Sequence, residues 1–513
     1  MSLRKKSFEM LPALRLRGRP LRSALRTVTI AWMFGVVWMS CISGSQMTLF
    51  GRLLGFSDMD FGIFGAVMYA ATLAQLVASI IIERTGLRKY IFIYFACGQR
   101  LLWLAIAAVP LLLKPGRAAV ATFMIIYGIG GVLAHVSTPA WQTWMGDMIP
   151  RRIRGRYLAS RWLWTLPIQI VVVLVAGWVL DLTTVPGPMV AERQTLLLRT
   201  ISVLFAVAAV FGTIDVLLFL RMREIVSPPL LNGRNGHRKR SLAGVVSGLR
   251  EVAGAIADAF RDRVFRHYAL YGATMAFGMI VGGQFFWLNS LENLGYSKLG
   301  ANFVFLVCGA ATSLLMARPW GKLIDRWGRR PVLILATIGV VFSPVGWLVI
   351  PPGSRLLAYL LGVASCALGG AFWSGINLAQ IGVIWGFAET PGRSKYMAAA
   401  AVVAAAGGFA GGLAGGWLAQ GLGYLQASPL QVGPFRWINY HFNFLASMVA
   451  RAAALAWLIG MPDPHAKPFR DMMRQIRFNA YNNVMPRLFW PLRAAGQWWS
   501  QRRARQNGVQ PPR

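Results

Sequence analysis

The chain has 513 residues, of which 56% are hydrophobic and only 14% are charged, a balance that excludes an ordinary soluble domain. In a soluble protein the net charge of +36 would indicate nucleic-acid binding, but here the basic residues lie between long apolar runs, so we expect no nucleic-acid partner. Cys41, Cys97, Cys308 and Cys366 all fall within apolar runs. We interpret them as small core residues, without a disulfide framework or a metal site.

Twelve apolar runs predict an all-α polytopic membrane protein, because each run is long enough to cross a bilayer. Their approximate bounds are 27–50, 60–82, a third run ending near 113, 118–148, 160–182, 197–220, 267–289, 301–318, 331–350, 356–387, 395–422 and 437–461. The first six form an N-terminal half (27–220) and the last six a C-terminal half (267–461). A basic arm (1–26), a linker (221–266) with an amphipathic helix near 242–260, and a basic aromatic tail (462–513) complete the chain.

The basic residues are distributed unevenly along these runs. Of the 53 Lys and Arg residues, 43 lie in the arm, the alternate short loops, the linker and the tail, eight lie in the intervening loops, and Arg100 and Arg451 lie inside apolar runs. The positive-inside rule therefore predicts that both termini are cytoplasmic. We expect a bacterial inner-membrane protein whose linker and tail contact lipid, and whose first apolar run is a retained helix rather than a signal peptide.

The most specific motif follows the eighth run, from Gly321 to Arg330 (GKLIDRWGRR). Gly321 predicts a close approach of two helices, and Gly328 predicts a tight turn. Asp325 needs a partner from another element, because a carboxylate at a helix C-terminus is disfavoured by the helix dipole. A degenerate copy of the motif contains Glu83, Arg84 and Gly86.

Two motif pairs recur at nearly one spacing, which indicates a duplicated chain. Glu83 and Asp325 lie 242 residues apart, while Tyr157 (in PRRIRGRY) and Tyr396 (in PGRSKY) lie 239 residues apart. The decapeptide resembles the G-x-L-x-D-R-x-G-R-R signature of the major facilitator superfamily of secondary transporters. The resemblance covers about residues 27–461, while signatures typical of its proton antiporters and sugar porters are absent, so it implies the fold but not the substrate.

The resemblance also implies which residues carry the function. In this superfamily helices 1, 2, 4, 5, 7, 8, 10 and 11 line a central cavity, and the signature motif forms a cytoplasmic gate. The implied gate residues are Glu83, Arg84, Gly86, Gly321, Asp325, Arg326, Gly328, Arg329 and Arg330. The polar and aromatic candidates on the cavity helices are Gln46, Gln75, His135, Thr138, Gln169, Gln284, Trp287, Asn289, Trp373, Ser374, Asn377 and Gln380.

These residues predict a transporter of a small, uncharged, polar or mixed organic solute, which binds between the halves near the bilayer midplane and moves by alternating access. The alternative for the cavity residues is polar contact between helices. The alternatives for the protein are a non-transporting membrane scaffold and a lipid-handling protein with a lateral opening. No motif indicates an enzyme or a cofactor, and we expect a monomer.

Overall fold

The computed structural model describes residues 18–85, 87–183, 191–222, 254, 257–386, 393–463 and 466–479. Most of the predicted amphipathic helix near 242–260, and the tail beyond 479, lie outside these residues. Within the described residues, twelve helices are long and apolar enough to cross a membrane. The predicted all-α fold with twelve transmembrane helices is therefore confirmed.

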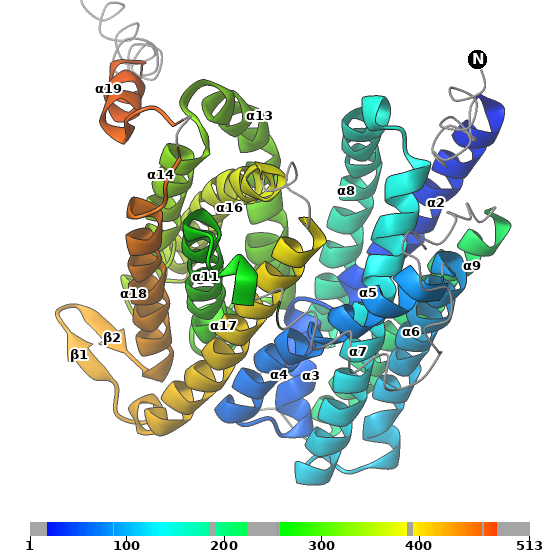
Figure 1. Cartoon of the computed structure of the whole chain (residues 1–513). Helices are drawn as coiled ribbons and strands as arrows, with labels where there is room; N and C mark the ends of the chain where they lie inside the picture. Colours follow the sequence, from blue (N-terminus) through cyan, green and yellow to red (C-terminus); the bar gives the residue numbers. More distant parts are fainter. Residues whose placement is uncertain are drawn as a thin grey trace, which may run out of the picture.

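The N-terminal half is drawn in blue and cyan in Figure 1. Its elements are α2 (Arg19–Cys41), α3 (Ser45–Leu54), α4 (Asp58–Ala71), α5 (Ala74–Thr85), α6 (Arg88–Leu112), α7 (Arg117–Met148), α8 (Arg151–Leu182), α9 (Ala191–Leu218) and the 3-10 turn η2 (Phe219–Arg221).

The C-terminal half is drawn in green, yellow and orange in Figure 1. Its elements are α11 (Arg263–Leu288), the π-helical turn η3 (Asn289–Asn293), α12 (Lys298–Asn302), the π-helical stretch η4 (Phe303–Cys308), α13 (Gly309–Trp327), α14 (Arg329–Phe342), α15 (Val345–Leu348), α16 (Arg355–Gly386), α17 (Arg393–Gly421), η6 (Gly423–Gln426), β1 (Leu430–Val432), β2 (Phe435–Trp437), α18 (Asn439–Ile459) and α19 (Phe469–Asn479). The antiparallel hairpin β1–β2, which pairs Leu430 with Trp437, was not predicted from the sequence.

The first transmembrane segment is broken, although the sequence predicted one continuous helix over 27–50. The break falls at Gly44, whose φ of +89° is available to glycine at little cost. The backbone N–H of Ser45, freed by the break, donates to Oδ1 of Asn302 at 2.9 Å. The local cause of the break is therefore a contact with the other half of the protein, which periodicity within one segment cannot reveal.

The signature motif is also more helical than predicted, because α13 continues to Trp327. The turn is confined to Gly328, whose φ of +91° confirms the predicted role of that glycine. Gly321 was predicted to allow close helix packing, but nothing would lie within 4 Å of a Cβ placed there. That prediction is wrong for this conformation.

The two halves meet along α4 and α17 and run apart toward the end that carries α19, as Figure 1 shows. We call that end the tail end, and the end that carries β1–β2 the hairpin end. The crossing of α4 and α17 depends on glycine: a Cβ on Gly62 would lie 2.5 Å from the carbonyl oxygen of Gly412 and 2.5 Å from Cα of Gly416. The close helix contacts predicted for the glycine-rich stretch of α17 are therefore present.

Candidate functional site

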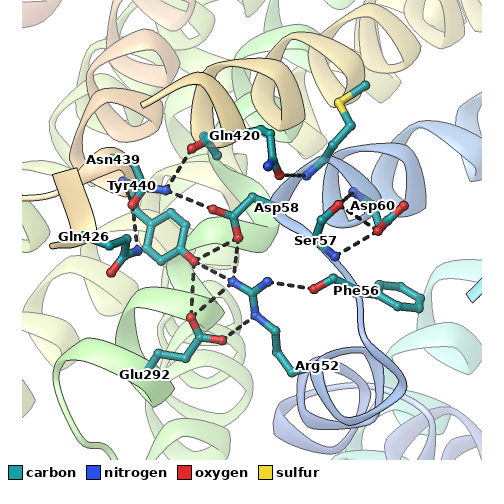
Figure 2. A network of polar contacts seen from close by, with 12 residues as sticks. Arg52, Phe56, Ser57, Asp58, Asp60, Glu292, Gln420, Gln426, Asn439 and Tyr440 are labelled. Atoms are coloured by element: carbon teal, nitrogen blue, oxygen red, sulfur yellow. Dashed lines mark hydrogen bonds and ion pairs between the residues drawn. The ribbon is translucent and has the colours of Figure 1, made fainter. Parts of the chain in front are cut away.

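A polar cluster joins the two halves at the hairpin end (Figure 2). Its members are Arg52, Asp58, Glu292, Asn439 and Tyr440, which we call the gate cluster. Arg52 donates from Nε to Oε1 of Glu292 at 2.6 Å and from Nη2 to Oδ1 of Asp58 at 2.5 Å. The same Nη2 donates to the hydroxyl of Tyr440 at 2.7 Å. Asn439 donates from Nδ2 to the other Asp58 oxygen at 2.9 Å.

The local sequence positions the N-terminal members of this cluster. Arg52 lies in the last turn of α3, and Gly55 (φ +100°) then reverses the chain. Ser57 caps α4 in a reciprocal pair with Asp60, which fixes Asp58 in the first helical turn. The carboxylate of Asp58 at a helix N-terminus is favoured by the helix dipole and lies beside the Arg52 guanidinium.

The charges in the cluster hold Arg52 in its ionised form. Burial alone would lower the pKa of the Arg52 guanidinium. The hydrogen bond to Glu292 and the nearby Tyr440 and Asp58 raise this pKa by more than burial lowers it, so the net pKa is above the ordinary value. The Arg52 side chain is 26% exposed and that of Glu292 is 35% exposed. The cluster is therefore partly screened by solvent, and its contribution to the contact between the two halves is moderate.

Two further contacts join the halves at this end. Asn302 is fully buried, and besides accepting from Ser45 it donates from Nδ2 to the carbonyl oxygen of Val173 at 3.0 Å. The carboxylate of Asp181, at the end of α8, accepts hydrogen bonds from the backbone N–H groups of Lys298 and Leu299 at 2.8 and 3.0 Å. These are the first residues of α12, so Asp181 caps a helix of the opposite half.

A cavity of about 380 Å³ lies beside the helix break. Its walls come from α2, α3, α4, α6 and α7, and the C-terminal half contributes Gln284, Trp287 and Leu306. Most of the lining is apolar or aromatic, while polar groups come from Ser43, Thr48, Gln99, Tyr127 and Gln284. Such a cavity suits a small molecule with both an apolar body and a few hydrogen-bonding groups.

Of the predicted cavity residues, Gln284 and Trp287 line this cavity. Gln46 does not: its side chain is fully buried and donates to the carbonyl oxygen of Ser40 at 2.7 Å, while its Oε1 accepts from Asn302. Asn289 lines a different cavity at the hairpin end. Gln46 and Asn289 therefore both lie outside the wall of the first cavity.

The other candidates lie elsewhere. Gln75 and His135 form a pair, with 2.8 Å between Nε2 of Gln75 and Nδ1 of His135. Thr138 and Ser374 each donate to a carbonyl oxygen of their own helix at 2.8 Å, Thr138 to that of Ala134 and Ser374 to that of Ala371. The remaining candidates are partly or fully exposed and outside the cavity lining: Gln169, Trp373, Asn377 and Gln380.

The predicted gate residues lie in different surroundings. Asp325 and Arg326 are exposed at the tail end. Arg330 donates from Nε to the carbonyl oxygen of Leu458 at 2.9 Å, so it caps the C-terminus of α18, and the backbone N–H of Arg330 donates to Asp463. Arg329 is half-buried. The side chains of Glu83 and Arg84, together with Gly86, lie outside the described residues.

The two arginines inside apolar runs both have polar partners. Arg100 lies 3.6 Å from Asp215, between Nη2 and Oδ2, and its guanidinium stacks 3.4 Å from the ring of Trp38. Arg451 donates to the carbonyl oxygen of Val340 and to Oγ of Ser343 at 3.2 and 3.1 Å. Trp38 lines the cavity, so the Arg100–Asp215 pair lies directly behind the cavity wall.

Sequence reasoning missed the gate cluster and most of the cavity lining, of which it named only Gln284 and Trp287. Gln99 was not considered because α6 corresponds to a helix that the family resemblance places outside the cavity. Arg52 was counted only among the basic loop residues, and Glu292 was not considered. Their signal in the sequence was the presence of opposite charges at equivalent helix ends of the two halves, 240 residues apart.

The fold and its cavity define a polytopic transporter-like membrane protein built from two six-helix halves. The sequence matches the family model of the Major Facilitator Superfamily over residues 27–385, and the chain belongs to this family. A comparison with curated proteins found no match.

Solved structures share the fold at low sequence identity. The chain is similar to a D-xylose–proton symporter (15% identity, TM-score 0.60, covering 87% of this chain and 99% of that one). It is also similar to the nucleoside transporter NupG (11%, 0.54, 88% and 98%). A third similar structure is the xylose transporter XylE from E. coli in an inward open conformation (14%, 0.56, 89% and 99%).

Proposed function

We propose that this protein carries a small organic solute across the membrane by alternating access, and that the structure is its inward-facing state. The observation that carries the proposal is the position of the gate cluster: it closes the hairpin end across the two halves, immediately beyond the cavity. In the described residues the corresponding motif at the tail end, around Asp325, makes no cross-half bond. In alternating access, each conformational state is closed at one end and open at the other.

The charge distribution supports the assignment of the sides. The tail end carries the loops and terminal segments that are rich in Lys and Arg, which favours the cytoplasm for that end. We therefore propose a bacterial inner-membrane location with both termini inside, and a monomer that contacts anionic lipid through its basic segments.

The cavity supports an uncharged or mixed solute. None of the described residues that line it is an acid or a base, and its volume of about 380 Å³ is at the lower end of the range for small-molecule sites. The same cavity argues against a scaffold with a filled centre. The solute would contact Gln99, Gln284 and Trp287, which belong to both halves, so its binding would be linked to the approach of the halves.

The experiment that tests this function begins with a thermal-stability screen of the purified protein against sugars, nucleosides, amino acids and other small metabolites, because a ligand of the folded state raises apparent stability. A solute that stabilises the protein is then assayed for counterflow in proteoliposomes. Saturable counterflow, lost when both Gln99 and Gln284 are replaced by Leu, supports transport. A solute that binds in the cavity but is never translocated would contradict it.

A further inference from the structure

A second cavity, of about 450 Å³, lies within the C-terminal half at the hairpin end and is separate from the solute cavity. Three segments enclose it: η3 with the residues that follow, the loop before α16, and the region from η6 through β2 to the start of α18. We call it the hairpin cavity.

The wall of the hairpin cavity contains an unpartnered buried donor. Asn289 is 1% exposed, and its Nδ2 has no hydrogen-bond partner, although its Oδ1 accepts from Asn293 at 3.4 Å. Asn289 begins a π-helical turn, in which the N–H of Leu294 donates to the Asn289 carbonyl at 3.0 Å. Such turns often occur at functional sites, and a buried amide without a partner favours an occupant that accepts a hydrogen bond.

His441 supplies a second donor. Its Nδ1 accepts from the backbone N–H of Ile438 at 3.1 Å, so in the neutral ring the proton is on Nε2. The residue is 7% exposed and lines the same cavity. Its ring is held in place by stacking on Trp437, with ring centroids 6.0 Å apart.

The rim of the hairpin cavity is positively charged. Arg355 and Arg436 both line it and are exposed, and none of the described lining residues is an acid. Guanidinium groups bind phosphate and carboxylate oxygens through paired donors. A cavity with two arginines, two neutral donors and no acid in its lining is chemically complementary to an anion.

We propose that the hairpin cavity binds a phosphate-like oxyanion, carried either by a free phosphate compound or by a lipid headgroup. Asn289 and His441 donate to the anion from the interior, and Arg355 and Arg436 neutralise its charge at the rim. This site takes a ligand of opposite character to that of the uncharged solute cavity.

The hairpin cavity also borders the gate cluster. Asn293 follows Glu292, and His441 follows Tyr440. A third lining residue, Gln426, donates from Nε2 to Oδ1 of Asn439 at 2.8 Å. An anion that orders these residues should stabilise the closed hairpin end, and by reciprocity closure should strengthen anion binding. This coupling rests on the proposed function, whereas the binding site itself does not.

The test measures binding of radiolabelled orthophosphate to the purified full chain in nanodiscs of phosphatidylcholine, at constant ionic strength. We expect saturable binding, weakened about ten-fold or more by Arg355→Gln, by Arg436→Gln and by Asn289→Leu. Lys114→Gln, which removes an exposed charge at the hairpin end of the other half, should change the dissociation constant less than about two-fold. The two arginines are exposed, so their variants keep the test valid if the Asn289 variant fails to fold.

Competing lipid distinguishes the two sources of the anion. Nanodiscs containing phosphatidylglycerol should abolish orthophosphate binding if the headgroup enters the cavity, and should leave it unchanged if the ligand is a free phosphate compound; either result supports the site. Absence of saturable binding in phosphatidylcholine, or binding that the three cavity variants leave intact, would overturn it. For the coupling, Arg52→Gln should weaken phosphate binding several-fold, and an unchanged affinity would overturn the coupling without affecting the site.

Discussion

Arg52 and Glu292 lie 240 residues apart in the chain, yet the Nε of one donates to the Oε1 of the other at 2.6 Å across the two halves. Asp58 and Tyr440 contact the same guanidinium, so a single side chain bridges both halves at the hairpin end. A charge-assisted hydrogen bond contributes about 1.5–3 kcal/mol, and partial exposure places this cluster toward the lower value.

The first prediction is that Arg52→Gln shifts the conformational equilibrium about ten-fold toward a state that is open at the hairpin end. The reason is that Gln keeps hydrogen-bonding capacity but removes the charge that holds both carboxylates. Distances between spin labels at Lys114 and Gln431 would report the change. Arg117→Gln is the matched control, because Arg117 pairs with Asp60 at 2.8 Å at the same end but within one half. An equal response of the two variants would contradict a specific role for Arg52.

The second prediction concerns pH. The pKa of Arg52 is raised above its ordinary value, so its contribution to closure is fully present below the unfolded pKa and is lost only as pH rises through the folded value. Both pKa values lie far above neutral pH. The Lys114–Gln431 label distance should therefore not change between about pH 7 and pH 10, provided that circular dichroism shows an intact fold. An opening with a midpoint inside that window would show that another titrating group controls the gate.

The third prediction uses the glycine crossing. A Cβ on Gly412 would lie 2.7 Å from the Gly62 carbonyl oxygen and 2.8 Å from Ala66, so Gly412→Ala should separate α4 from α17. Overpacking of this kind costs about 1–3 kcal/mol. Cysteines introduced at the hairpin end should then react faster with an impermeant reagent. Gly421→Ala on the same helix, where a Cβ meets nothing within 4 Å, should leave the labelling rate unchanged.

These relationships show how much the sequence could predict. Alternating apolar runs and basic loops predicted the twelve helices and the two halves, since length and hydrophobicity determine insertion locally. The break at Gly44 and the position of Gln46 could not be predicted, because Asn302, 256 residues away from Gln46, stabilises them. Gln75 and His135 were both named, but their mutual contact depends on how α5 packs against α7. Gln99 was excluded by family resemblance alone.

The fourth prediction separates the cavity of the structure from the cavity expected from the sequence. Gln284→Leu and Gln99→Leu should each weaken binding of the transported solute about ten-fold, because a buried polar group of the solute would lose its partner. Gln169→Leu, a sequence candidate outside the cavity lining, should have little effect. Binding measured by thermal shift would reveal the difference. If only the Gln169 variant lost binding, the solute would not bind in the cavity lined by Gln99 and Gln284.

The fifth prediction is that Asp325 forms a latch when the tail end closes, with the segment from Glu389 to Lys395 as its partner. Residues 387–392 lie outside the described part of the structure, and Asp325 itself is exposed in this state. Asp325→Asn should favour the state open at the tail end and slow turnover about ten-fold, with solute affinity retained. Asp471→Asn, an exposed acid on α19, is the control. Normal turnover in the Asp325 variant would contradict the latch and would show that the motif has only a structural role.

The most direct test of alternating access measures both ends of the same protein. Spin-label pairs at Thr85 and Lys322 report the tail end, and pairs at Lys114 and Gln431 report the hairpin end. We predict two populations whose distances change in opposite directions, with Arg52→Gln lengthening the hairpin-end distance and shortening the tail-end distance together. A single population at both ends, unchanged by solute and by Arg52→Gln, would contradict the account.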